Sequence, residues 1–442
     1  MNILVNILAA IVVLGGLIMF HEYGHFWAAR RCGVRVLTFS IGFGRPIWWR
    51  EDRHGTRFAI SMLPLGGYVR LQDRNPDPAI APEQSEAFED QSLLARAFIM
   101  LAGPLANFLL AIVVFWGLFM YGVSGVAPII GDVTHDSPAA SAGLSSKQEI
   151  TAVDRQPVST WQQVDTLLRG RSGQVDIETK AGHHYQVSMD NVSPTEPAWT
   201  SLGLTPWQPV IPAVIGQVID KGPAALAGLR MGDRILHLND QPVDSWQTLV
   251  ARVRELPIEQ GISLGIEHAN GTTGVLTLTP TIHTSSTGQQ VNYIGAGAMA
   301  PEWPAGYIRT VRLGPVAALG TSIERTWQLS VTTVEAIGKM VTGALSPRNL
   351  SGPIMISKVA GDTARSGTEA FFAFLAYLSI SLGILNLLPV PMLDGGHLLY
   401  FAFEALRGRP LSERVQMWGR CLGMVLIGTL MITAFYFDLT RV

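Results

Sequence analysis

The sequence predicts a polytopic α-helical membrane protein with four transmembrane helices and a soluble section inserted between the second and the third. Hydrophobic residues make up 48% of the 442 residues and charged residues only 15%, against about 25% in a typical soluble domain. The apolar residues gather in four long uncharged runs, and a segment between two of these runs is repeated. The net charge of −2 offers no basic surface for nucleic acid, so no nucleic-acid partner is expected.

The four uncharged runs define the expected membrane spans. The chain carries no charged residue in 1–20, 97–131, 370–393 and 421–437. A helix that rises 1.5 Å per residue needs about 20 residues to cross the hydrocarbon core. Spans are therefore predicted near 3–25, 97–121, 370–390 and 420–437. Four such runs in one chain disfavour the alternative, which is a soluble protein with unusually apolar core helices.

Basic residues next to the spans predict the orientation. They follow the first span, start the second, and lie between the third and the fourth: Arg30, Arg31, Arg35, Arg96, Arg407, Arg409, Arg414 and Arg420. Such residues mark the cytoplasmic flanks of spans. We therefore expect 30–95 and 400–420 on the cytoplasmic side, and both termini and the section 125–315 outside the cytoplasm.

The first span ends in an H-E-x-x-H motif, formed by His21, Glu22 and His25. Residues i and i+4 share one face of a helix, so both histidines can reach one metal ion. Glu22 is then placed to take a proton from water that the metal activates. Ionisable residues within a span are costly and usually functional. The alternative is that the cluster merely marks the end of the span.

A catalytic zinc site needs a third protein ligand. Asp394 follows a long uncharged run, just after Pro389 and Pro391, which break a helix. Irregular backbone at membrane depth is tolerated only where protein or a cavity satisfies it. Asp394 is therefore the candidate ligand, while the role of the nearby His397 stays open.

Together the two motifs resemble the site-2 protease family of intramembrane zinc metalloproteases. The resemblance implies a Zn²⁺ cofactor held by His21, His25 and Asp394, with Glu22 as the general base and Asn386 as a polar group near the substrate or its oxyanion. It also implies a bacterial inner-membrane protein whose active site lies towards the cytoplasmic side. The expected substrates are single-pass membrane proteins already trimmed by a first protease, either of the anti-sigma-factor type or remnant signal peptides.

Two glycine-containing segments, 40–44 and 64–68, resemble the membrane-associated β-hairpin of bacterial members of that family, and 102–107 resembles their second span. A helical substrate must unwind before its peptide bonds can be attacked, and an edge strand could hold the unwound segment as an added strand. The glycines that would permit this close approach are Gly42, Gly44, Gly66 and Gly67. The alternative is that the hairpin only covers the site.

The inserted section contains an internal repeat. Residues 137–144 reappear as 222–229, and the same offset relates Trp161 to Trp246, which indicates two copies of one domain. Residues 227–239 resemble the core of a PDZ domain. The two copies bind peptide termini, filter substrates by size, or act as spacers. After them, apolar residues recur at helical spacing over 310–350, which predicts an amphipathic helix in the membrane interface or packed on the repeats.

The expected organisation follows from these points. It comprises transmembrane helix 1 (1–26), the β-hairpin region (27–95), helix 2 (96–123), PDZ domain 1 (124–208), PDZ domain 2 (209–300), the amphipathic helix and loop region (301–369), helix 3 with the Leu-Asp-Gly motif (370–398), a cytoplasmic loop (399–419) and helix 4 (420–442). The alternative function is a non-catalytic membrane adaptor with PDZ domains, which would need no metal.

Overall fold

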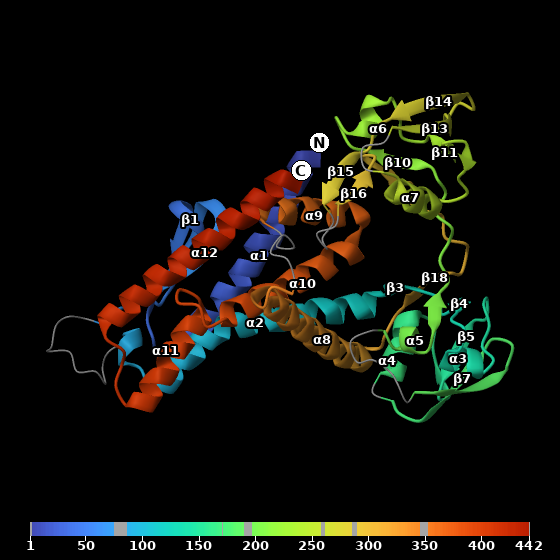
Figure 1. Ribbon diagram of the computed structural model, residues 1–442. Coiled ribbons are helices and arrows are strands. Elements are labelled where there is room, and N and C mark those ends of the chain that lie inside the picture. Colours follow the sequence, from blue (N-terminus) through green and yellow to red (C-terminus); the bar gives the residue numbers. More distant parts are fainter. Residues whose placement is uncertain are drawn as a thin grey trace. The chain divides into compact units, whose positions relative to one another are not determined.

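The structure is a computed structural model that describes residues 2–74, 86–169, 171–189, 197–257, 261–284, 290–344 and 352–441. They divide into two compact units, one made of Met1–Val123 with Arg312–Val442 and the other of Ser124–Val311. Figure 1 shows that the first is mainly helical and the second is built of short strands and helices.

Among the described residues of the first unit, four helices are long and apolar enough to cross a membrane, as predicted: α1 (Asn2–Arg31), α2 (Leu93–Tyr121), α10 (Thr368–Leu387) and α12 (Glu413–Arg441). Their most apolar windows have mean hydropathies between 1.8 and 2.4. Helix α1 continues past the predicted end of its span, and α12 begins before Arg414 and Arg420. Charged residues end an apolar run without ending a helix, so hydropathy places the spans better than their boundaries.

The segment after α10 corrects one expectation. Helix α10 stops at Leu387, and a new helix, α11 (Asp394–Arg407), occupies part of the expected loop 399–419. The region 370–398 assigned to helix 3 therefore contains the end of α10, the expected proline break and the start of α11. Proline cannot donate the backbone hydrogen bond that continues a helix, and Pro389 and Pro391 lie in the break. Helix α11 ends at Gly408, which has a left-handed φ of 68°.

A β-sheet packs beside α1 in the first unit. It is formed by β1 (Val36–Glu51) and β2 (Arg57–Leu71), and a short 3₁₀ helix, Phe88–Asp90, follows. Residues 36–41 pair with 57–60 on one side and with 67–71 on the other. Within the described residues, no further strand pairs with the outer edge of 67–71. This free edge lies next to the first span, because a Cβ on Gly67 would be 3.2 Å from the Cγ of Glu22.

Two helices precede α10, where the region 301–369 was expected to hold one helix and a loop: α8 (Pro315–Val341) and α9 (Pro353–Ser366). Helix α8 runs along α2 (Figure 1) and buries Ala318, Ser322 and Thr326. Its outward stripe stays apolar and exposed: Val316, Ile323, Trp327, Val334 and Val341. Helix α9 begins where the buried Asp438 carboxylate accepts hydrogen bonds from three main-chain amides, which satisfies donors that a helix N-terminus leaves free.

The second unit contains two sheets with matching strand orders, β6-β5-β7-β8 and β12-β11-β13-β14. The first copy comprises β4 (Ile130–Val133), α3 (Pro138–Ser141), β5 (Ile150–Val153), β6 (Gln156–Pro157), α4 (Trp161–Leu168), β7 (Gln174–Thr179), β8 (His184–Ser188), α5 (Ala198–Ser201) and β9 (Leu204–Pro206). The second comprises β10 (Ile215–Val218), α6 (Pro223–Leu226), β11 (Arg234–Leu238), β12 (Gln241–Pro242), α7 (Trp246–Glu255), β13 (Ile262–Glu267), β14 (Thr273–Leu278), β15 (Thr281–Thr284), β16 (Gln290–Tyr293) and β17 (Ala296–Ala298). Each copy has its own apolar core, so the sequence repeat is also a structural repeat.

The chain enters and leaves this unit through two paired strands, β3 (Val123–Val126) and β18 (Ile308–Val311). The returning segment packs against the first copy, with the rings of Tyr307 and Trp207 4.3 Å apart between centroids. The Ala127 amide also donates a hydrogen bond to the Tyr307 carbonyl at 2.8 Å. The returning segment is thus fixed to the first copy.

Candidate metal centre and active site

Three ligand-type side chains converge from two helices. His21 and His25 lie on α1 and are buried, each 8% exposed. Asp394 is the first residue of α11. The two histidine Nε2 atoms are 3.2 Å apart. The Asp394 Oδ2 atom lies 3.2 Å from the Nε2 atom of His21 and 3.3 Å from the Nε2 atom of His25. Within the described residues, this is the group of three side chains that could hold a metal ion; His397 is not part of it.

The geometry and chemistry of this cluster fit a metal ion. Ligands placed about 2.0–2.1 Å from a tetrahedral zinc ion are roughly 3.3 Å from one another, which is the spacing seen here. The Asp394 Oδ2 atom is buried and, within the described part of the chain, faces only the two imidazole nitrogens without forming a hydrogen bond, which leaves its charge available to a cation. Two imidazole nitrogens and one carboxylate oxygen are a donor set of catalytic zinc sites, which keep a fourth position open.

Helix α2 holds both histidine rings, although it supplies no ligand. The Nδ1 atom of His25 lies 2.8 Å from the Ile99 carbonyl. The Nδ1 atom of His21 lies 3.3 Å from the side-chain amide of Asn107. Gly103 lies between these contacts, and a Cβ there would be 2.5 Å from the Cε1 atom of His25. The sequence singled out 102–107 only as part of a span. The signal that could have been used is a glycine and an asparagine four residues apart, on one face of an apolar helix.

The cluster opens into a cavity of about 400 Å³. Glu22 and Asn386 line this cavity beside the three ligand-type residues, and Gly67 lines it from the free edge of the sheet. Met392, which was not singled out, also lines it and has a left-handed φ of 92°, a strained conformation for a residue with a side chain.

The other three glycines lie outside this cavity. Gly66 packs beneath the Phe43 ring. Gly42 and Gly44 have φ values of 92° and 90°, a conformation that favours glycine, and they do not line the cavity. The structure therefore brings Gly67 to the site, whereas Gly42 and Gly44 are explained by the positive φ that the backbone adopts at these positions.

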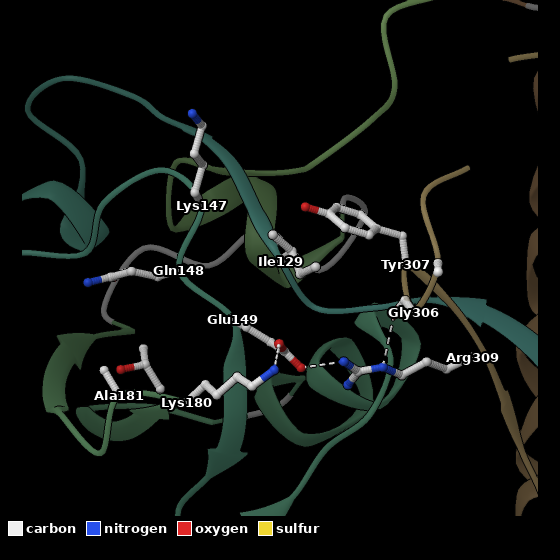
Figure 2. A pocket seen from close by; sticks show the side chains of 11 residues that line it. Ile129, Lys147, Gln148, Glu149, Lys180, Ala181, Gly306, Tyr307 and Arg309 are labelled. Carbon is white, nitrogen blue, oxygen red and sulfur yellow. Dashed lines mark hydrogen bonds and ion pairs between the residues drawn. The ribbon is translucent and has the colours of Figure 1, made fainter. Parts of the chain in front are cut away.

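A larger cavity, of about 650 Å³, lies in the second unit. Figure 2 shows the Glu149 carboxylate between Lys180 and Arg309, at 3.1 and 2.5 Å. Burial raises the pKa of Glu149, but the hydrogen bonds from Arg309 and Lys180 outweigh burial and lower it overall. The Arg309–Glu149 pair joins the returning segment to the first copy, whereas the Lys180–Glu149 pair lies within that copy. The metal-type cluster lies in the smaller cavity, so we assign the chemistry there.

A buried His-His-carboxylate cluster among apolar helices, open to a cavity that a glutamate lines, has the residues of a metal-dependent hydrolase site. The model of Peptidase family M50 matches residues 9–430. The chain therefore belongs to Peptidase family M50.

Full-length relatives agree with this assignment. The chain is 41% identical to a "Putative zinc metalloprotease" of Vibrio cholerae over 451 residues, covering 100% of this chain and 99% of the relative. It is 41% identical to "Protease RseP" of Yersinia pestis and 38% identical to "Regulator of sigma-E protease RseP" of Escherichia coli, each over 456 residues and 100% of both chains.

A solved PDZ domain of an SdrC-like protein from Listeria monocytogenes aligns with 21% of this chain and 90% of its own length. The identity is 18% and the TM-score 0.18, values too low to carry an argument about the fold.

Proposed function

We propose that this protein is an intramembrane zinc metalloprotease that hydrolyses peptide bonds within transmembrane segments of single-pass membrane proteins. The observation that carries the proposal is the buried cluster of His21, His25 and Asp394, which lies among apolar helices and opens into the cavity that Glu22 lines. These three residues would hold a zinc ion, which when bound would supply Lewis-acid activation of water and of the scissile carbonyl. Glu22 accepts the proton of the attacking water and returns it to the leaving amine.

The substrate segment is held in an unwound form. The free edge of residues 67–71 offers main-chain groups for one added strand. Gly67 lines the cavity, and its missing Cβ lets this edge lie close to Ile18 and Glu22 of α1. Asn386 reaches the same cavity, and its amide donates a hydrogen bond to the substrate carbonyl as negative charge develops there.

The names of the relatives support a role in the regulation of sigma-E. The resemblance of the motifs to site-2 proteases, and not those names, suggests an envelope stress response with an anti-sigma factor as the substrate type and remnant signal peptides as a second class. We place the protein in a bacterial inner membrane, with both termini periplasmic and the site towards the cytoplasm, because basic residues flank the spans on that side. The two repeats, 124–208 and 209–300, act as periplasmic PDZ domains that bind peptide termini or admit only trimmed substrates. The matching strand orders support two copies of one domain, and the resemblance of residues 227–239 to a PDZ core suggests the class.

Replacing Glu22 tests the proposal. Glu22→Gln should leave zinc bound and abolish cleavage of a tagged single-span substrate, because the amide cannot accept the proton. Glu335→Gln, the same change on an exposed part of α8, should cleave like the wild type. Full cleavage by Glu22→Gln, or by protein stripped of metal, would contradict the proposal and favour an adaptor.

Removing the periplasmic domain of a substrate tests whether the two repeats act as a size filter. The wild-type protein should cut a substrate without its periplasmic domain and spare the untrimmed form. Equal cleavage of the two forms would remove the filter role while leaving the protease assignment intact.

A further inference from the structure

Asn107 is a fully buried polar residue with no role in the proposed reaction. It lies on α2 and is 0% exposed. Its main-chain carbonyl accepts a hydrogen bond from the Ser379 hydroxyl at 2.7 Å. Its side-chain amide points at His21, with Nδ2 3.3 Å from the imidazole Nδ1. The amide Oδ1 is buried and has no hydrogen-bond partner among the described residues.

Metal binding decides which ring nitrogen of His21 carries the proton. The Nε2 atom of His21 faces Asp394 and His25, so a metal ion there would need the Nε2 lone pair. A neutral imidazole then carries its proton on Nδ1 and must donate it to an acceptor. His25 has such an acceptor in the Ile99 carbonyl, 2.8 Å from its Nδ1 atom. The group at the corresponding place beside His21 is the amide of Asn107.

An asparagine amide can meet this need by turning over. Its oxygen and nitrogen have nearly the same shape, and their assignment is made from the hydrogen bonds around them. The other end of this amide has no partner within the described residues, so His21 alone favours one orientation. With Oδ1 towards His21, the amide accepts from Nδ1–H. With Nδ2 towards His21, it would force the proton onto Nε2 and block the metal.

We infer that Asn107 is a positioning residue for the metal centre, whose Oδ1 accepts the Nδ1 proton of His21 and so keeps Nε2 free to bind the metal ion. The inference rests on the proposed zinc site, and it adds a residue from a helix that supplies no ligand. Partners of this kind orient a ligating histidine, and their loss typically weakens metal binding about 10–100-fold.

Two substitutions of Asn107 distinguish a hydrogen-bond acceptor from a donor and from a side chain that only fills space. Asn107→Asp keeps an acceptor and removes the donor, whereas Asn107→Leu keeps the approximate volume and removes both. In the purified full-length protein, Zn²⁺ affinity is measured by competition with a chelator. We expect Asn107→Leu to bind Zn²⁺ about 10–100-fold more weakly than the wild type, and Asn107→Asp to bind at least as tightly. Asn107→Ala replaces the leucine variant if that one does not fold, with the same expected loss.

Ser379→Ala is the matched control, because it removes the bond to the main chain of Asn107 and leaves the amide beside His21. Its Zn²⁺ affinity should equal that of the wild type. Wild-type affinity in Asn107→Leu or Asn107→Ala would overturn the inference, and so would an Asn107→Asp variant as weak as Asn107→Leu. If instead the wild type bound no Zn²⁺, or His21→Ala bound it fully, the zinc site itself would be wrong.

Discussion

Gly103→Ala should destroy the metal site while leaving the helix intact. A Cβ at this position would lie 2.5 Å from the Cε1 atom of His25 and 2.8 Å from its Cδ2 atom, whereas real Cβ contacts are essentially never under 3.0 Å. The Nε2 atom of His25 would lie nearer still, so the ring must retreat by at least about 0.8 Å, whereas metal–ligand distances tolerate only about 0.2 Å. The hydrogen bond from His25 to Ile99 opposes that retreat, so the ring turns out of place or α1 and α2 separate.

The same substitution has an opposite effect on the helix itself. Alanine is favoured over glycine in a helix interior by roughly 1 kcal/mol, so propensity alone predicts a more stable protein. Gly117 provides the matched control, because it lies on the same helix and a Cβ there meets nothing within 4 Å. Gly117→Ala should therefore be as stable as the wild type or more so, with unchanged zinc affinity.

Both variants are compared as purified full-length proteins. We expect Gly103→Ala to bind Zn²⁺ at least about tenfold more weakly, or about 1.4 kcal/mol, and to lose cleavage in proportion. A chelator competition and cleavage of a tagged single-span substrate measure the two effects. The reasoning is refuted if Gly103→Ala matches Gly117→Ala in both, because the position of the His25 ring would then not depend on the missing Cβ.

Two further predictions concern ion pairs. The Arg96 guanidinium binds Glu404 through two contacts, at 2.6 and 3.3 Å, so Glu404→Gln should lower the free energy of unfolding by about 1–3 kcal/mol. Thermal melts of the two single variants and the double variant with Arg96→Met should show clearly non-additive effects. Additive effects would contradict the pairing. Because the folded-state pKa of Glu149 is lowered, its pairing stabilises the fold above the unfolded carboxyl pKa, about 4.3, and is lost as pH falls through the folded value. Glu149→Gln should therefore weaken the hydrogen-exchange protection of β18 by about 1 kcal/mol at pH 7. Below both pKa values the variant and the wild type should show the same protection, and a difference that persisted there would contradict the role of this ion pair.

The sequence predicts the ligand-type residues because each stands out against an apolar background. His21 and His25 share a helix face through their spacing alone, and Asp394 is the first charged residue after a long apolar run. The same reasoning predicts four candidate spans, because hydropathy responds to composition. It cannot predict where a helix ends when charged residues continue it, which is why the start of α12 was misplaced and most of α11 was expected to be a loop.

The supporting contacts could not be predicted, because they depend on which helices pack together. The hydrogen bond to His25 uses the main-chain carbonyl of Ile99, which every residue type offers, so no sequence pattern marks it. Gly103 and Asn107 are unusual for a span only once α1 is known to lie against that face. In a single sequence, a glycine in an apolar helix is equally consistent with close helix packing anywhere along the span.

Helix α2 supplies no ligand, and yet it contacts both helices that carry the three ligand-type residues. The carbonyl of Ile99 fixes His25, Asn107 contacts His21, and Arg96 binds the helix that begins with Asp394. Together with Gly103 these positions are spaced by three or four residues, so they lie on one face of α2. Leu105 and Leu109 point away from that face and are exposed. Alanine substitutions along α2 should therefore lower Zn²⁺ affinity with helical periodicity, strongly at 103 and 107 and hardly at 105 and 109. An aperiodic profile would mean that the ligands are held by α1 and α11 alone.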